Sequence, residues 1–100
     1  MPNVVDKFTP TYDLDAFKRS KIEIKIAAMR GAAALGFGRT DIYAVIKTMN
    51  KTHFYKSMTS YQNHRIWQDV YHVPYSGITL YIKFTKGTLT EFTLLSFKEK

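Results

Sequence analysis

The spacing of apolar residues changes near the middle of this 100-residue chain, and that change constrains the fold more than any other feature. In the first half the apolar residues recur at helical spacing. Three segments there are expected to form helices: "YDLDAFKRSK", "AAMRGAAALGFG" and "RTDIYAVIKTMNK". The second half holds ten of the fifteen aromatic residues and many β-branched ones, which favour strands. Four strands are expected there, over residues 54–60, 65–72, 79–85 and 90–98.

Local signals refine these boundaries. Asp13 is a plausible N-cap for the first helix and Thr40 for the third, while Gly36 or Gly38 can end the second. The segment "KIEIKI" alternates strictly, which predicts a short strand with Ile22, Ile24 and Ile26 on one side. Turn residues are expected to mark two loops: Pro74 and Gly77 before the third of the four strands, and Lys86 and Gly87 before the last.

Helices followed by strands with short connections predict an α+β domain. The N-terminal helices would pack on one face of a largely antiparallel sheet. The length suits a single domain over residues 1–100, with residues 1–12 as a loose lead-in.

Charge and composition limit the classes of function. The net charge is +7 and the isoelectric point about 9.7, so the chain attracts polyanions, of which nucleic acid is the commonest in a cell. The alternative is a charge that only keeps the surface soluble. Cysteine is absent, which excludes disulfides, thiolate metal sites and a cysteine nucleophile. We see no signal peptide and no membrane-spanning run, and we expect a cytoplasmic protein.

Alternation along the last two strands separates a buried face from an open one. Leu80, Ile82 and Phe84 point one way, and Tyr81 and Lys83 the other. In the last strand Leu95 and Phe97 are expected to be buried, and Ser96 and Lys98 exposed. The open face would therefore be basic and carry a phenol.

The two earlier strands add to this open face. In "FYKSMTS", Lys56 shares one side of the strand with Phe54 and Met58, whereas Tyr55 shares the other side with Ser57 and Thr59. Lysine is rarely left in a core, so Lys56 should face outward. In "RIWQDVY", burial of Trp67 and Tyr71 would bring Gln68 outward. The predicted open surface is Lys56, Gln68, Tyr81 and Lys98, with Lys83 nearby; the alternative is that these are merely the solvated positions of the sheet.

Four tracts, "FYKSMT", "IWQDVY", "LYIK" and "SFKEK", resemble the MqsR toxins, a family of RelE-like bacterial messenger-RNA interferases. The resemblance implies a RelE-like fold and a metal-independent endoribonuclease without a cofactor, which cuts mRNA at short, GC-containing sites by attack of the 2′-OH. It also implies an MqsA-like antitoxin that contains zinc, through which alone the toxin would meet operator DNA. The family's functional positions fall on Lys56, Gln68, Tyr81 and Lys98. His72 departs from the family's best-known member, which has an arginine there.

Each of these four side chains suits a part of that chemistry. Lys56 and Lys98 can stabilise negative charge on the phosphate, although one of them would act as a base if its pKa were lowered by about 3 units. Tyr81 can donate to the leaving oxygen or orient the phosphate. Gln68 does not titrate, so it would position a phosphate or a base edge.

A second set of residues is expected to bind the substrate: Tyr55, Met58, Tyr61, His64, His72 and Lys83. Tyr55 and Tyr61 can stack on unpaired bases. His64 and His72 would position the substrate or transfer a proton.

Two other functions remain compatible with the same basic face. One is a non-catalytic RNA- or DNA-binding regulatory module, which would bind RNA without cutting it. The other is a protein-interaction domain whose basic face binds an acidic partner.

Overall fold

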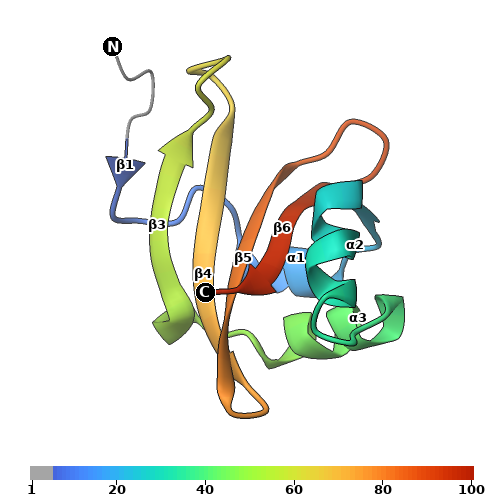
Figure 1. Cartoon of the computed structure of the whole chain (residues 1–100). Helices are drawn as coiled ribbons and strands as arrows, with labels where there is room; N and C mark the ends of the chain where they lie inside the picture. The colour runs from blue at the N-terminus through green and yellow to red at the C-terminus, as the bar shows by residue number, and fades with distance from the viewer. Residues whose placement is uncertain (1–5) are drawn as a thin grey trace.

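The computed structural model describes residues 6–100 (Figure 1). Residues 1–5 of the expected lead-in lie outside the described residues. The elements in chain order are β1 (Asp6–Lys7), α1 (Leu14–Arg19), β2 (Ile22–Ile24), α2 (Ile26–Ala33), α3 (Arg39–Thr48), the 3-10 turn η1 (Lys51–His53), β3 (Phe54–Thr59), β4 (Trp67–Tyr75), β5 (Ile78–Lys86) and β6 (Phe92–Glu99).

The strands form one six-stranded sheet in the order β1-β3-β4-β5-β6-β2. All neighbours are antiparallel except β2 and β6, which run parallel. Strands β3 to β6 follow one another as a meander, and the two short strands from the N-terminal half complete its edges. The three α-helices lie together on one side of the sheet (Figure 1). The predicted α+β class, with N-terminal helices on a largely antiparallel sheet, is confirmed.

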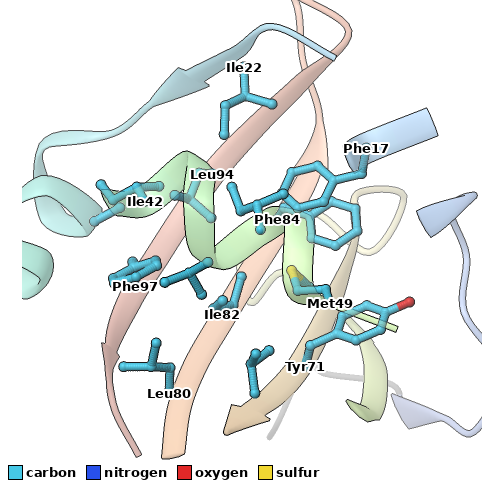
Figure 2. Close-up of a cluster of buried hydrophobic side chains, with 14 of the residues drawn as sticks. Phe17, Ile22, Ile42, Met49, Tyr71, Leu80, Ile82, Phe84, Leu94 and Phe97 are labelled. Carbon is cyan, nitrogen blue, oxygen red and sulfur yellow. The ribbon is translucent and has the colours of Figure 1, made fainter. Parts of the chain in front are cut away.

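The core lies between the helices and one face of the sheet (Figure 2). The ring of Phe17 from α1 stacks on Phe84 of β5 with the centroids 3.7 Å apart, and Ile42 of α3 is fully buried over the same face. Leu80, Ile82 and Phe84 are all buried, as alternation predicted. Burial of each such apolar side chain stabilises the folded state by about 1.5–3 kcal/mol. The helices thus cover one face, and the opposite face is left open.

Two helix starts differ from expectation. Ile26 is not the end of a strand but the first residue of α2, and it is 67% exposed. The chain leaves the sheet at Lys25, whose N–H makes a last bond to the carbonyl of Leu94. The N-cap of α3 is Gly38, two residues before the expected Thr40, because the Asp41 carboxylate accepts the Gly38 N–H at 2.8 Å and closes the first turn there.

Pro74 lies within β4, not in the loop where it was expected, and pairs with Thr79. The turn consists of Ser76 and Gly77 alone, both with positive φ, at 50° and 82°. Such two-residue turns match the twist of antiparallel strands. Because β3 pairs with β4 only as far as Tyr71, the end of β4 is an edge where proline is tolerated.

Two register shifts interrupt the predicted alternation. The first lies in β3 between Phe54 and Lys56, so Tyr55 shares the open face with Lys56 instead of following the buried Ser57. The second lies between β5 and β6, where Lys83 pairs with Ser96 and the next partner is Leu94. Leu94 is consequently buried, and Leu95, which was expected in the core, is only partly buried. Such bulges add one unpaired residue to a strand.

Trp67 was also expected in the core, but it is only partly buried and lies outside the core cluster. The Nζ of Lys7 lies over its ring, 4.5 Å from the centroid. The prediction for Tyr71 is confirmed, since it is fully buried. The ring of Trp67 therefore contacts Lys7 of the edge strand β1 and does not belong to the core cluster.

The lead-in was expected to be loose, but from residue 6 onward it contains strand β1 and is hydrogen-bonded to the buried carboxylate of Asp69 in β4. The N–H of Thr11 donates to its Oδ1 at 3.0 Å, and the N–H of Tyr12 to its Oδ2 at 2.9 Å.

Asp69→Asn should lower the free energy of unfolding by about 1–3 kcal/mol, because an amide cannot accept both bonds with the strength of a carboxylate. Urea denaturation would measure the loss. Glu99→Gln, at an exposed position, is the control and should change stability little. Equal stabilities for both variants would contradict the anchoring role of Asp69.

Candidate active site

The open face carries its polar side chains in rows that run across the strands. Directly paired residues of an antiparallel sheet project from the same face. One row passes from Lys56 through Val70 and Lys83 to Ser96. The next row passes from His72 through Tyr81 to Lys98. The topology therefore gathers three lysines, from β3, β5 and β6, around the centre of the sheet.

A pocket of about 260 Å³ opens at one end of these rows. Its lining comes from β3, the loop after it, β4 and β5: Met58, Thr59, Ser60, Tyr61, Gln62, Gln68 and Lys83. Gln68 pairs with Met58 across β3 and β4, which places the amide beside the thioether. The pocket thus joins the predicted Gln68 to three of the predicted substrate-binding residues.

Aromatic rings occupy the other end. The rings of Tyr55 and His72 are stacked with their centroids 4.2 Å apart, and His72 lies 6.0 Å from Tyr81. Two lysines lie over these rings: the Nζ of Lys56 is 5.5 Å from the centroid of Tyr55, and that of Lys98 is 5.2 Å from that of Tyr81. Cations at this distance are attracted to the ring face. Lys98 is thereby held over the ring of Tyr81, and Lys56 over that of Tyr55.

The electrostatics of the face are dominated by positive charge. Burial, followed by the charges of Lys98 and Lys56, lowers the pKa of Lys83 below the usual lysine value. Burial raises the pKa of the Tyr81 phenol, with a smaller contribution from Tyr55, so this hydroxyl remains protonated at neutral pH. Burial and then Lys100 lower the pKa of His72 below 6.5, which leaves the imidazole largely neutral at pH 7.

One carboxylate balances part of this charge. The Oδ2 of Asp6, on the edge strand β1, lies 3.6 Å from the Nζ of Lys56. The other ion pair within residues 6–100 joins Lys25 to Glu23 and involves none of Lys56, Lys83 and Lys98. The face therefore keeps a net positive charge and suits a phosphate.

The structure brings together all but one of the predicted site residues. The open face or its pocket holds Lys56, Gln68, Tyr81, Lys98, Tyr55, Met58, Tyr61, His72 and Lys83. Tyr55 and Tyr61 are well exposed, at 50% and 66%. His64 is exposed in the loop between β3 and β4, and no recorded bond or ring contact links it to the face.

Sequence reasoning missed four contributors to the site. Asp6 is one, and Thr59, Ser60 and Gln62 of the pocket are the others. Nothing in the local pattern points to Asp6, because its role depends on β1 pairing with a strand about fifty residues away. The polar loop after β3 was the available signal for Ser60 and Gln62.

A larger pocket of about 430 Å³ lies at the buried face and has a different character. Its lining is Pro10, Tyr12, Asp13, Leu14, Lys51, Phe54 and Tyr71. The hydroxyl of Tyr71 has no hydrogen-bond partner among the described residues, and burial, followed by Asp69 and Asp13, raises the pKa of Tyr71 to about 12. None of the predicted site residues lines this pocket, and it lacks the lysine cluster.

Ligands for a metal ion are not gathered anywhere in residues 6–100, where no three side chains of His, Asp or Glu form a cluster. Within the same residues, no helix is both long and apolar enough to cross a membrane.

The fold and the site define a small α+β domain with one helix-covered face and one open face that is cationic and aromatic. The sequence profile of the family described as "Motility quorum-sensing regulator, toxin of MqsA" matches residues 9–99. A curated relative, the mRNA interferase toxin MqsR of Escherichia coli (strain K12), is 33% identical over 100 residues, which span 96% of this chain and 100% of the relative. The chain belongs to the MqsR toxin family.

Proposed function

We propose that this chain is an mRNA interferase, a toxin that cleaves messenger RNA on the open face of its sheet. The observation that carries the proposal is the convergence of Lys56, Tyr81 and Lys98 from three strands, with Gln68 in the adjoining pocket. Surfaces that bind RNA combine cations for the phosphates with rings for the bases, and this face has both.

The RNA supplies its own nucleophile in this proposal. The 2′-oxygen attacks the adjacent phosphorus, the bond to the 5′-oxygen breaks, and a 2′,3′-cyclic phosphate and a 5′-hydroxyl remain. Lys56 and Lys98 stabilise the charge that develops on the phosphate oxygens. The protonated phenol of Tyr81 donates to the leaving 5′-oxygen. Gln68 holds a phosphate or base edge from the pocket.

The nucleotides flanking the cleaved bond would bind at the two ends of the face. The stacked pair of Tyr55 and His72 offers a platform at one end, and the exposed ring of Tyr61 offers a second at the pocket. Met58 provides an apolar contact between them. We expect short, GC-containing cleavage sites in single-stranded mRNA.

The proposed partners are the mRNA substrate in the cytoplasm and an MqsA-like antitoxin that contains zinc. We expect contact with operator DNA only through that antitoxin. The toxin itself would need neither a metal nor another cofactor, because the lysines and the tyrosine supply the charge and the proton.

Purified protein incubated with defined RNA in EDTA is expected to cut it and leave 2′,3′-cyclic phosphate and 5′-hydroxyl ends. End mapping by mass spectrometry would identify both products. Lys56→Ala should reduce cleavage by about 10²–10³-fold, the usual effect of losing one group that stabilises transition-state charge. Lys47→Ala, on an exposed position of α3, is the matched control and should cut normally.

Two results would contradict the proposal. Products with 5′-phosphate ends, or activity lost on chelation, would exclude attack by the 2′-OH without a metal. Binding of RNA with no strand scission would instead identify a regulatory RNA-binding module.

A further inference from the structure

Lys83 occupies the centre of the open face. It pairs with Val70 of β4 on one side and with Ser96 of β6 on the other, so strands flank it on both sides. Its side chain is partly buried and lines the pocket together with Gln68. A lysine in this position is shielded from solvent yet remains open to a ligand in the pocket.

The charges around Lys83 all oppose its protonation. Lys56 approaches from β3 and Lys98 from β6, and among residues 6–100 no carboxylate forms an ion pair with Lys83. The other titratable groups of this face are Tyr55, His72 and Tyr81; the lowered pKa of His72 and the raised pKa of Tyr81 leave those two largely neutral at pH 7. Burial and like charge both disfavour an ammonium ion, which is why the pKa of Lys83 is lowered.

The two neighbouring lysines are placed differently. Lys56 has the Asp6 carboxylate 3.6 Å away, which stabilises its charged form. Lys98 is exposed and lies over the ring of Tyr81, and solvent and the ring face both favour the cation. Among residues 6–100, Lys83 has neither a neighbouring carboxylate nor full exposure to solvent, and it is the member of the cluster whose pKa burial and like charge lower.

We propose that Lys83 is the general base of the cleavage reaction, and that Lys56 and Lys98 hold the phosphate. The inference rests on the proposed ribonuclease function and names the group that starts the reaction. The neutral Nζ of Lys83 takes the proton of the 2′-OH while the 2′-oxygen forms its bond to phosphorus. The bond from phosphorus to the 5′-oxygen breaks, and that oxygen takes the proton of the Tyr81 hydroxyl. Solvent then removes the proton from Lys83 and returns one to Tyr81, so the enzyme is regenerated.

Lys83→Arg tests this role directly, since arginine keeps the positive charge but does not lose its proton. We expect kcat/KM to fall by about 10²–10⁴-fold. Affinity for an RNA with a 2′-deoxy nucleotide at the cleavage site should stay within about threefold of that of the native protein, because both side chains bind phosphate. Lys56→Arg and Lys98→Arg should lose less activity, and Lys47→Arg, on α3, should lose none.

The pH profile gives a second readout. A base must be neutral to act, so kcat/KM of the native protein should rise with pH until the pKa of Lys83 is passed. That rise should be absent from the residual activity of Lys83→Arg. Nitrogen-15 NMR of lysine side chains in the native protein should also show one lysine that titrates below the others, and its signal should be missing from the variant.

The outcomes separate the two proposals. If the native protein does not cut RNA, the ribonuclease proposal fails. If it cuts in EDTA but Lys83→Arg cuts equally fast with the same pH profile, the ribonuclease proposal stands and the role of Lys83 is overturned. Should the variant fail to fold by circular dichroism, the NMR titration decides: a Lys83 pKa at or above about 10.4 would overturn the inference.

Discussion

Tyr81→Phe is expected to slow RNA cleavage by about 10²–10⁴-fold, the usual contribution of one acid or base group. The substitution removes only the hydroxyl, which in the proposed mechanism donates to the leaving oxygen. The remaining ring should keep its contacts with Lys98, whose Nζ lies 5.2 Å from the ring centroid, and with His72, whose ring centroid lies 6.0 Å away. The loss should therefore appear in kcat, with little change in the binding of RNA that lacks the 2′-OH at the cleavage site. Single-turnover cleavage of a short RNA would measure it.

Tyr75→Phe is the matched control for this experiment. Tyr75 lies on the same sheet, but its ring packs against Phe37 on the helix side. The Tyr75→Phe variant should leave cleavage unchanged, because this ring packs on the helix-covered face and not on the open face. If Tyr81→Phe cut RNA as fast as the control, Tyr81 would have no part in proton donation, and its role would be reduced to packing.

Gly31→Ala should destabilise the fold by about 3 kcal/mol or more, at the upper end of the usual effect of overpacking. Gly31 lies in α2, which packs on β6, and an added Cβ would overlap the carbonyl oxygen of Phe97. That oxygen belongs to the backbone of the sheet and cannot move aside as a flexible side chain would. A small domain has only about 5–15 kcal/mol of stability in total, so much of the protein would unfold. Thermal and urea denaturation would measure the change.

Gly38→Ala provides the comparison, since its added Cβ would meet nothing closer than the Asp41 carboxylate at 3.9 Å. Its effect should be about 1 kcal/mol or less, as is usual at the start of a helix. Equal stabilities of the two variants would show that α2 can move away from β6. Such movement would also affect the site, because Lys98 directly follows Phe97 in that strand.

The sequence predicted the parts of this site that depend on simple alternation. Tyr81 and Lys83 lie opposite the buried Leu80, Ile82 and Phe84, and no bulge separates these residues within β5. Tyr81 and Lys98 were both assigned to the open face, and in the structure they pair directly across β5 and β6. Period-2 reasoning works here because one face of the sheet is covered by helices and the other is not.

The features that sequence missed arise from contacts between distant segments. The bulge at Tyr55 and the one opposite Lys83 depend on how neighbouring strands pair, which a single strand does not encode. Trp67 has a large ring, but that ring lies beneath the Nζ of Lys7 from β1 and outside the core cluster. The edge position of Pro74 depends on where β3 ends. In each case a tertiary neighbour overrode the local pattern.

The bulge in β3 lets one short strand place two kinds of side chain, a ring and a cation, on the open face. In a regular strand Tyr55 and Lys56 would point to opposite sides, and the domain would have to choose between a ring and a cation at this edge. The extra residue of the bulge brings the adjacent Tyr55 and Lys56 to the same side of the strand. In the proposed function, an insertion or deletion that removed the bulge would therefore separate base stacking by Tyr55 from charge neutralisation by Lys56.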